Sequence, residues 1–308
     1  QAKALGVDPN HHIALLLGFG FDLAGAISVI DPEKPEKKHL NHVDEATLAA
    51  LSGRASLSGV QRKLSIIQEG NQYRPAGPNE LSTHIAKLSS GHLFDLIELE
   101  YLTTLAVHKL LPDDNTVTTK IATIPSIKEE ALIIPRFDRI VTEKHTKRIH
   151  FEEFNQLLGR YSGEDKYEAS YEELGQFIMK TPGCAPAEAD RLLQRILTCL
   201  LVGNTDAHLK NFAMFHTRDG LRLTPAYDLV ASAVYPEFQS IALRISGIQN
   251  LTLGQLKPKH LLQMTDGFGL SEEALVTAVE MIGRNLPSTF ENLSKSNIGS
   301  KMLRNQLI

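Results

Sequence analysis

The chain has 308 residues, of which 42% are hydrophobic and 22% are charged, and its formal net charge at pH 7 is −4. This balance is typical of a globular protein with one large domain or two lobes, and it argues against broad nucleic-acid binding by this chain alone, which needs a basic face. The two cysteines do not form a disulfide framework, which favours a reducing, cytoplasmic compartment. The longest apolar stretch, residues 13–30, is interrupted by Asp22 and three glycines, so we expect no membrane span.

The N-terminal half predicts mostly strands, with a few helices between them. The predicted elements are, in chain order, a short helix and a strand within 13–30, a proline-containing charged linker at 31–39, a helix at 44–51, a polar loop at 52–63, two strands joined by a Gly70-Asn71 turn, a strand at 81–88, a long helix at 92–111, and a strand running into a loop at 131–140.

The C-terminal half predicts mostly helices, and a strand and loop at 223–232 interrupt them. Helical patterns cover 151–159, 168–179, 186–202, 257–265 and 271–285. In 186–202 the leucines and isoleucines recur at helical spacing on one face, Pro186 suits the first turn, and Gly203 suits the position just past the end. The sequence therefore predicts a two-lobed α+β protein, β-rich in its N-terminal lobe (41–140) and mainly helical in its C-terminal lobe (141–308).

The stretch 203–211, GNTDAHLKN, places many polar groups directly after an apolar helix. Asp206 and Asn211 have the separation found between the catalytic aspartate and the metal-binding asparagine of protein kinases. In protein kinases the carboxylate accepts the proton of the hydroxyl group that receives the phosphate, and the amide oxygen binds magnesium. Asp228 follows 17 residues after Asn211, and we expect two strands and a turn to return it beside Asn211. The spacing alone is weak, because a capping Asp and a turn Asn would also produce it.

Other residues appear in the linear order of a bilobal kinase. Lys87 lies within the strand predicted at 81–88, where a kinase places its ATP-binding lysine, although an edge strand can also carry a solvent-facing lysine. Glu98 and Glu100 lie on the next helix, as a lysine partner or as part of a solvated face. The small-residue segment 56–63 precedes them and predicts either a phosphate-covering loop or a plain flexible loop. It matches neither G-x-G-x-x-G nor the Walker pattern.

The sequence resembles the HipA-like serine/threonine kinases of bacterial toxin–antitoxin modules. The segments that carry the resemblance lie between about 52 and 232 and are SLSGVQRKLS, STHIAKL, ELEYL, PRFDR, FEEFNQLLG, GNTDAHLKNF and PAYDLVAS. The resemblance implies a bilobal protein-kinase-like fold in which residues 1–40 are a remnant of the family's N-terminal subdomain. It therefore points to the short, HipT-type form of the family.

The resemblance also implies ATP and Mg2+ as ligands and assigns roles to individual residues. Asp206 would be the catalytic base, and Asn211 and Asp228 would hold Mg2+. Glu100 would be the partner of Lys87. The implied ATP-binding residues are Ser58, Gly59, Val60, Gln61, Arg62 and Lys63 in the phosphate loop, Lys87, Pro135, Arg136 and Phe137 at the adenine hinge, and His208, Lys210, Asn211, Tyr227 and Asp228. Pro135 replaces a glutamate that is common in long members, which puts one side-chain contact at the hinge in question.

The family autophosphorylates a serine in the phosphate loop, and Ser56 and Ser58 match that region. A phosphoserine adds about −1.5 to −2 charges at pH 7, so it would repel the ATP phosphates or draw the loop outward. The two residues therefore suggest an off-switch, and the alternative is a pair of ordinary loop serines.

The resemblance further implies protein partners. They are a target protein, in this family an aminoacyl-tRNA synthetase, a small HipS-like protein that supplies the missing N-terminal subdomain, and a HipB-like antitoxin through which DNA is reached. Two other readings stay open from the sequence. The chain could be a catalytically silent module that joins the antitoxin as a co-repressor, or a small-molecule kinase that uses the same Asp, Asn and Asp chemistry.

Overall fold

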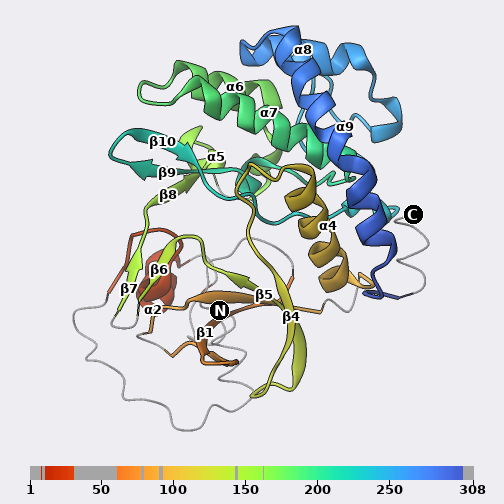
Figure 1. Ribbon diagram of the computed structural model, residues 1–308. Helices are drawn as coiled ribbons and strands as arrows, with labels where there is room; N and C mark the ends of the chain where they lie inside the picture. Colours follow the sequence, from red (N-terminus) through yellow and green to blue (C-terminus); the bar gives the residue numbers. More distant parts are fainter. Residues whose placement is uncertain are drawn as a thin grey trace. The chain divides into compact units, whose positions relative to one another are not determined.

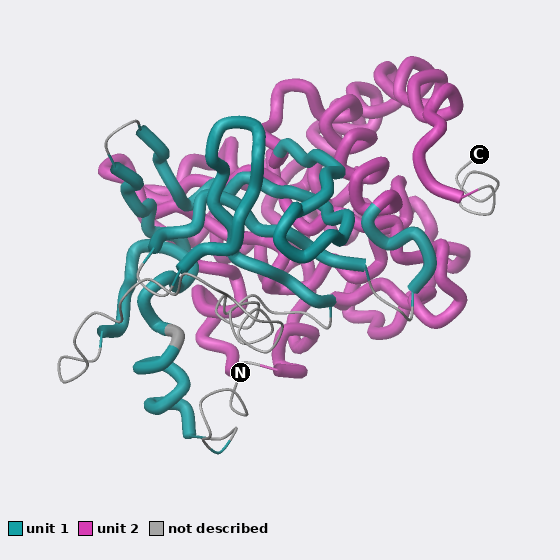
Figure 2. Tube along the Cα trace, turned by 90° about the horizontal axis from the view of Figure 1, so that it is seen from below, with its two compact units in different colours: residues 1–97, 118–151 teal, residues 98–117, 152–308 magenta. Residues whose placement is uncertain are grey.

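The computed structural model describes residues 8, 11–30, 61–77, 80–89, 93–142, 145–161 and 163–300. The chain divides into two compact units, which Figure 2 colours separately. Unit 1 comprises residues 1–97 and 118–151, and unit 2 comprises residues 98–117 and 152–308. The division near 151 lies close to the predicted lobe boundary at 140, but residues 98–117 belong to unit 2 and not to the N-terminal lobe where we expected them.

A five-stranded antiparallel sheet forms the main part of unit 1 (Figure 1). Its spatial order is β2-β1-β3-β5-β4. The strands are β1 (Lys63–Glu69), β2 (Gln72–Pro75), β3 (His84–Leu88), β4 (Lys120–Ile124) and β5 (Glu129–Pro135). The predicted turn at Gly70-Asn71 joins β1 to β2, while β4 was missed because its pattern KIATI is short. Alternating residues of β1, including Leu64 and Ile66, face the apolar core of this unit.

The segment 11–30 of unit 1 contains helix α2 (His12–Phe19) and the short 3-10 helix η1 (Gly20–Asp22). The strand predicted within 24–30 is wrong, because these residues have no strand structure. Backbone carbonyl groups of this segment accept hydrogen bonds from arginine side chains and not from a neighbouring strand. Arg139 donates to the carbonyl oxygen of Gly25, and Arg148 donates to that of Ile27. The hairpin β6 (Arg139–Val141) and β7 (Thr146–Arg148) completes the unit.

Unit 2 is mainly helical and carries a small sheet of order β10-β9-β8 (Figure 1). Its strands are β8 (Phe151–Glu153), which begins at the unit division, β9 (Ala213–Thr217) and β10 (Gly220–Leu223). Its helices are α4 (Leu96–Leu110), most of which belongs to this unit, α5 (Phe154–Leu157), α6 (Tyr171–Lys180), α7 (Pro186–Leu201), α8 (Pro258–Phe268) and α9 (Glu272–Ser294). Short 3-10 helices are η2 (Glu164–Tyr167), η3 (Leu209–Asn211), η4 (Ser232–Val234) and η5 (Leu253–Gln255).

Helix α4 belongs to unit 2 because its C-terminal half packs into the core of that unit. Val107, Leu110 and Leu111 join the large apolar cluster there. Two hydrogen bonds add to this packing: Ala231 N donates to Thr103 Oγ1 over 3.1 Å, and the Asn285 side chain donates to the Leu110 carbonyl over 3.1 Å. Burial against a neighbouring element, and not position along the chain, therefore determines which unit holds the helix.

Helix α7 follows the predicted pattern and positions the polar segment that comes after it. Its apolar face is buried, with Leu192, Leu193 and Ile196 at 0% exposure. Gly203 adopts a left-handed conformation with φ of +76°, which glycine adopts without the cost of a Cβ atom. The helix predicted at 151–159 is only partly formed, because residues 151–153 pair as β8 before the short helix α5 begins. Within the described residues no helix has the length and apolarity needed to cross a bilayer.

Candidate active site

The backbone of the loop that follows α7 is held by hydrogen bonds from several parts of unit 2. The N–H groups of Thr205 and Asp206 both donate to Ser232 Oγ, over 3.0 and 3.2 Å. The Tyr171 hydroxyl donates to the Ala207 carbonyl over 2.9 Å. Thr205 and Ser232 are buried, so these bonds are shielded from water. These hydrogen bonds therefore fix the backbone position of Asp206.

Asn211 and Asp228 lie side by side, as the sequence predicts. The hairpin of β9 and β10 reverses the chain between them, and the Asn211 amide donates to Asp228 Oδ2 over 2.7 Å. The amide oxygen of Asn211 accepts the His208 N–H over 2.9 Å. Asp228 has a φ of +56°, a left-handed conformation that is uncommon outside glycine, asparagine and aspartate. Such backbone conformations persist where the surrounding structure enforces them, and they cluster at functional sites.

The side chains of Asn211 and Asp228 fit a hard divalent cation. Carboxylate and amide oxygens are the protein ligands that Mg2+ prefers, and Mg2+ commonly uses only one or two of them together with phosphate oxygens and water. The Asn211 amide oxygen accepts one hydrogen bond and retains a second lone pair, and Asp228 has two carboxylate oxygens. The two side chains are adjacent, but the amide nitrogen of Asn211 contacts Asp228 and its oxygen faces the His208 N–H, so the Asn211 side chain would have to turn to place both oxygens on one cation.

The carboxylate of Asp206 has an environment suited to a general base. Burial raises its pKa, and the nearby charge of Asp228 acts in the same direction, while a hydrogen bond from Tyr167 and the charge of Lys166 partly oppose the shift. The Tyr167 hydroxyl donates to Asp206 Oδ1 over 3.0 Å. A base with a raised pKa accepts a proton more readily near neutral pH. Sequence reasoning missed Tyr167, because no spacing pattern links residues 39 positions apart.

Three further predicted ligand residues of unit 2 lie in or beside the same loop. His208 is buried, and burial together with the charge of Lys166 lowers its pKa to about 4, so its ring is neutral at pH 7. The Tyr227 hydroxyl donates to the Lys210 carbonyl over 2.7 Å and so supports the loop backbone. The unit therefore brings Asp206, His208, Lys210, Asn211, Tyr227 and Asp228 together in one region.

In unit 1, the predicted ATP-binding lysine lies on the sheet. Lys87 is on β3 with 5% of its surface exposed, and its Cα partner on β1 is Lys63. Cross-strand partners project to the same face, and like charges placed there are unfavourable unless an anion or acidic group compensates them. The role of Lys87 and Lys63 in binding the ATP phosphates stays a prediction.

The remaining phosphate-loop predictions are only partly within the described residues. Gln61 donates to the Leu88 carbonyl over 3.1 Å, and Arg62 forms an exposed ion pair with Glu129. Ser56, Ser58, Gly59 and Val60 lie outside the described residues. Glu100 is buried in α4 of unit 2, and its pairing with Lys87 of unit 1 stays a prediction.

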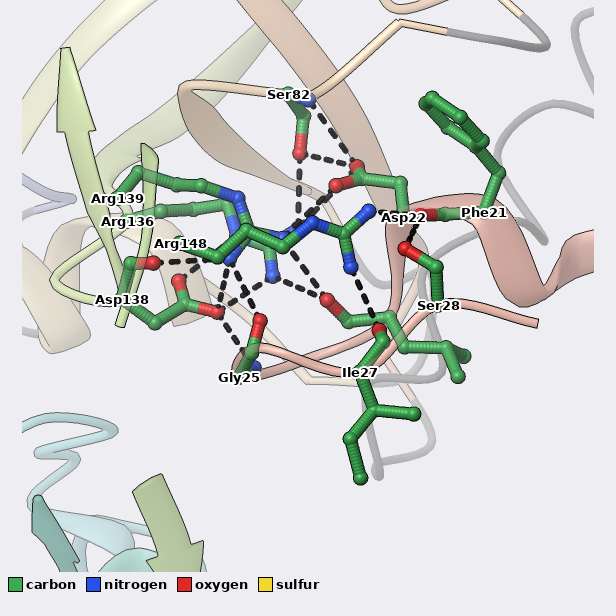
Figure 3. A network of polar contacts seen from close by, with 11 residues as sticks. Phe21, Asp22, Gly25, Ile27, Ser28, Ser82, Arg136, Asp138, Arg139 and Arg148 are labelled. Carbon is green, nitrogen blue, oxygen red and sulfur yellow. Dashed lines mark hydrogen bonds and ion pairs between the residues drawn. The ribbon is translucent and has the colours of Figure 1, made fainter. Parts of the chain in front are cut away.

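At the predicted adenine hinge, the side chain of Arg136 is fully engaged within unit 1 (Figure 3). Its guanidinium donates to Asp138 over 2.8 and 3.0 Å, to Ser82 over 2.9 Å, to Asp22 over 3.2 Å and to the Leu23 carbonyl over 3.0 Å. A contact between this side chain and a nucleotide would require breaking that network. The hinge role of residues 135–137 stays a prediction. At Arg136 only the backbone atoms would be available to contact a nucleotide.

Arg139 extends this network, which we call the arginine–aspartate cluster (Asp22, Ser82, Arg136, Asp138 and Arg139). Arg139 donates to Asp138 over 2.7 Å and to Asp22 over 2.9 Å. The four charged members are buried. Burial acts to raise the pKa of Asp138, but its hydrogen bonds and ion pairs with Arg136 and Arg139 outweigh burial and lower it. Asp138 therefore remains ionised in the folded chain.

Comparison with known proteins establishes the family. The model of the HipA-like C-terminal domain matches residues 55–290. The chain belongs to the HipA-like family. It is 30% identical over 318 residues to the serine/threonine-protein kinase toxin HipA of Shewanella oneidensis, an alignment that covers 92% of this chain and 71% of that protein.

Solved structures confirm the kinase-like fold of this HipA-like chain. A Shewanella oneidensis HipA, solved together with HipB and operator DNA, matches with a TM-score of 0.81 and 25% identity over 99% of this chain and 79% of that chain. The Helicobacter pylori proinflammatory kinase CtkA matches with a TM-score of 0.53 and 13% identity over 82% of this chain and 86% of that chain, a likeness of fold alone. The predicted α+β kinase-like fold is confirmed.

Proposed function

We propose that this HipA-like chain is an ATP-dependent serine/threonine protein kinase that acts as the toxin of a bacterial toxin–antitoxin system. The observation that carries the proposal is the convergence of Asp206, Asn211 and Asp228 in unit 2 on one supported loop region. This arrangement combines a base of raised pKa with two oxygen-bearing side chains suited to Mg2+. Family membership adds independent support for kinase chemistry.

Each residue would act at a stated point of phosphoryl transfer. Asp206 accepts the proton of the acceptor hydroxyl as that oxygen bonds to the γ-phosphorus of ATP and the bond to ADP breaks. Asn211 and Asp228 would hold Mg2+, and the bound ion would offset negative charge on the phosphates. Lys87, with Lys63 beside it on the sheet, binds the phosphate oxygens. The buried loop backbone keeps Asp206 in place without reorganisation.

The finer features of the proposal rest on the family resemblance. The acceptor is a serine or threonine of a target protein, and an aminoacyl-tRNA synthetase is the target class that would arrest translation. Autophosphorylation at Ser56 or Ser58 would place negative charge where the ATP phosphates bind, and it would therefore switch the kinase off.

Two partners are included in the proposal. The Shewanella oneidensis HipA structure contains HipB and operator DNA, which supports a HipB-like antitoxin through which this acidic chain reaches DNA. A second, HipS-like partner is supported by apolar side chains of unit 1 that remain exposed, namely Ile13, Leu16, Ile27 and Ile30. Exposed apolar side chains gathered on one short segment are typical of a binding surface.

Intact mass spectrometry of the purified chain after incubation with Mg-ATP tests the kinase proposal. The parent should gain phosphate mass or transfer phosphate to a protein of a cell extract, and Asp206→Ala should do neither. Asp219→Ala is the matched control, because Asp219 is an exposed aspartate at the turn between β9 and β10. Equal labelling by the parent and Asp206→Ala would overturn the assignment of the base.

The two alternatives from the sequence correspond to other results of this experiment. ATP binding without transfer to any acceptor would favour a silent co-repressor that acts through the antitoxin. Transfer to a small hydroxyl compound but to no protein would favour a small-molecule kinase. The similarity to a toxin kinase and the intact set of Asp206, Asn211 and Asp228 both support the protein kinase over these readings.

A further inference from the structure

The short helix η2 presents two residues to the catalytic loop. The Tyr167 hydroxyl donates to Asp206 Oδ1 over 3.0 Å, and within the described ranges this is the only hydrogen bond that the Asp206 carboxylate receives. The anchors at Ser232 hold only the backbone of Asp206. The direction in which the carboxylate points is therefore determined by Tyr167.

The ring of Tyr167 is itself held from two sides. The Lys166 ammonium lies 4.8 Å from the ring centroid, within the range of a cation–π contact. The His208 ring meets it edge to face, with centroids 5.3 Å apart and an interplanar angle of 73°. Because His208 belongs to the catalytic loop, this ring contact packs η2 against the loop next to the Asp206 carboxylate.

We propose, resting on the kinase function above, that Tyr167 is a positioning residue: its hydroxyl holds one oxygen of Asp206 and leaves the other oxygen directed to the acceptor hydroxyl. A base must lie within hydrogen-bond reach of the proton that it abstracts, and a freely rotating carboxylate spends less time in that position. Tyr167 acts through Asp206 and takes no proton itself.

A neutral phenol suits this task better than a cation. A salt bridge would strongly favour the ionised carboxylate and weaken it as a base, whereas a phenol orients it at a smaller cost in basicity. Within the described residues, the charged and titratable groups around the base are Lys166 and Tyr167 from η2, Tyr171 from α6, Asp228 from the segment after β10, and His208 from the loop itself. Lys166 is held against the Tyr167 ring, so it influences Asp206 at a distance.

The test compares Tyr167→Phe with the full parent chain. This substitution removes one hydroxyl and retains the ring and its contacts. Tyr161→Phe is the matched control, because Tyr161 lies near η2 with 83% of its surface exposed. Circular dichroism and Tm establish that each variant is folded. ADP release from Mg-ATP gives kcat and KM, since it counts transfer to any acceptor, including water.

We expect kcat of Tyr167→Phe to fall about tenfold to 100-fold while KM for ATP stays unchanged, because only the position of the base is lost. Tyr161→Phe should behave as the parent. An unchanged kcat would overturn the proposal. A raised kcat would also overturn it, because it would mean that the hydroxyl blocks the acceptor position.

A second measurement does not depend on kinase activity. The 13C signal of the Asp206 carboxyl is followed against pH without nucleotide, and Asp206→Asn identifies the signal. Loss of a hydrogen bond to the ionised carboxylate should raise its pKa in Tyr167→Phe but not in Tyr161→Phe. If the parent neither releases ADP nor labels itself or a protein of a cell extract, the kinase proposal fails and this titration alone decides the contact. An unchanged titration would then overturn the positioning role.

Discussion

Asp138 of unit 1 and Asp206 of unit 2 lie in opposite electrostatic environments. In unit 1, Asp22 and Asp138 are matched by the guanidinium groups of Arg136 and Arg139, and the pKa of Asp138 is lowered. In unit 2, Asp206 receives its hydrogen bond from a neutral phenol, and its pKa is raised. A carboxylate paired with arginine holds the fold together, whereas one kept with neutral partners retains the basicity that catalysis needs.

The largest effect expected from this contrast is on activity. Asp206→Asn should lower phosphate transfer by about 10²-fold to 10⁴-fold, the range for removal of a general base, and should leave the chain as stable as the parent or more stable. The reason is that the substitution removes a partly buried negative charge that lies near the charge of Asp228. Labelling with Mg-ATP and urea unfolding measure the two quantities. A destabilised Asp206→Asn would show that this carboxylate is structural after all.

The second effect is on stability. Asp138→Asn should destabilise unit 1 by about 3–5 kcal/mol, because it removes one of the two carboxylates that the buried guanidinium groups of Arg136 and Arg139 share. Urea unfolding measures the loss of unfolding free energy. Phosphate transfer is measured alongside it and is expressed per folded molecule of the variant. A change below about 1 kcal/mol, which is typical of exposed ion pairs, would contradict a structural role for the arginine–aspartate cluster.

The pH dependence of stability should differ in sign between the two aspartates. The folded pKa of Asp138 lies below its unfolded value of about 3.9, so its contribution is complete above that value and is lost as the pH falls through the folded pKa. The folded pKa of Asp206 lies above its unfolded value, so folding disfavours its ionised form and this penalty disappears as the pH falls through the folded pKa.

These opposite signs are measured by urea unfolding of the parent, Asp138→Asn and Asp206→Asn between pH 7 and pH 3. The stability advantage of the parent over Asp138→Asn should shrink as the pH is lowered. Any advantage of Asp206→Asn over the parent should shrink as well. Asp114, whose pKa is also lowered, is present in all three chains and cancels in the differences. If the unfolding free energies of all three chains changed with pH in parallel, the distinction between the two aspartates would be contradicted.

The smallest effect is expected at the surface of unit 1. Glu129→Gln breaks an ion pair with Arg62 whose side chains are 40% and 63% exposed. Exposed pairs contribute about 0–1 kcal/mol, so urea unfolding should detect little change. This variant calibrates the loss at Asp138, since both substitutions remove one carboxylate charge from the same unit.

Local patterns in the sequence were enough to predict the elements that carry the catalytic candidates. The apolar face of 186–202, the glycine that follows it and the return of Asp228 beside Asn211 through a hairpin are all confirmed. The prediction of a strand within 24–30 was wrong, because arginines distant in the sequence donate hydrogen bonds to the backbone carbonyls of that segment. Helix α4 was expected in the N-terminal lobe, but its packing places most of it in unit 2.

The sequence by itself determined the periodic elements, the turn at Gly70-Asn71 and the spacing of Asp206, Asn211 and Asp228, because these depend on neighbours a few residues away or on a single hairpin. Only the tertiary structure decided which charges are paired. Tyr167 meets Asp206 across 39 positions, and Arg136 meets Asp22 across 114. Whether a buried carboxylate becomes a structural ion or a base depends on such contacts, because desolvation and nearby charge are properties of the folded chain.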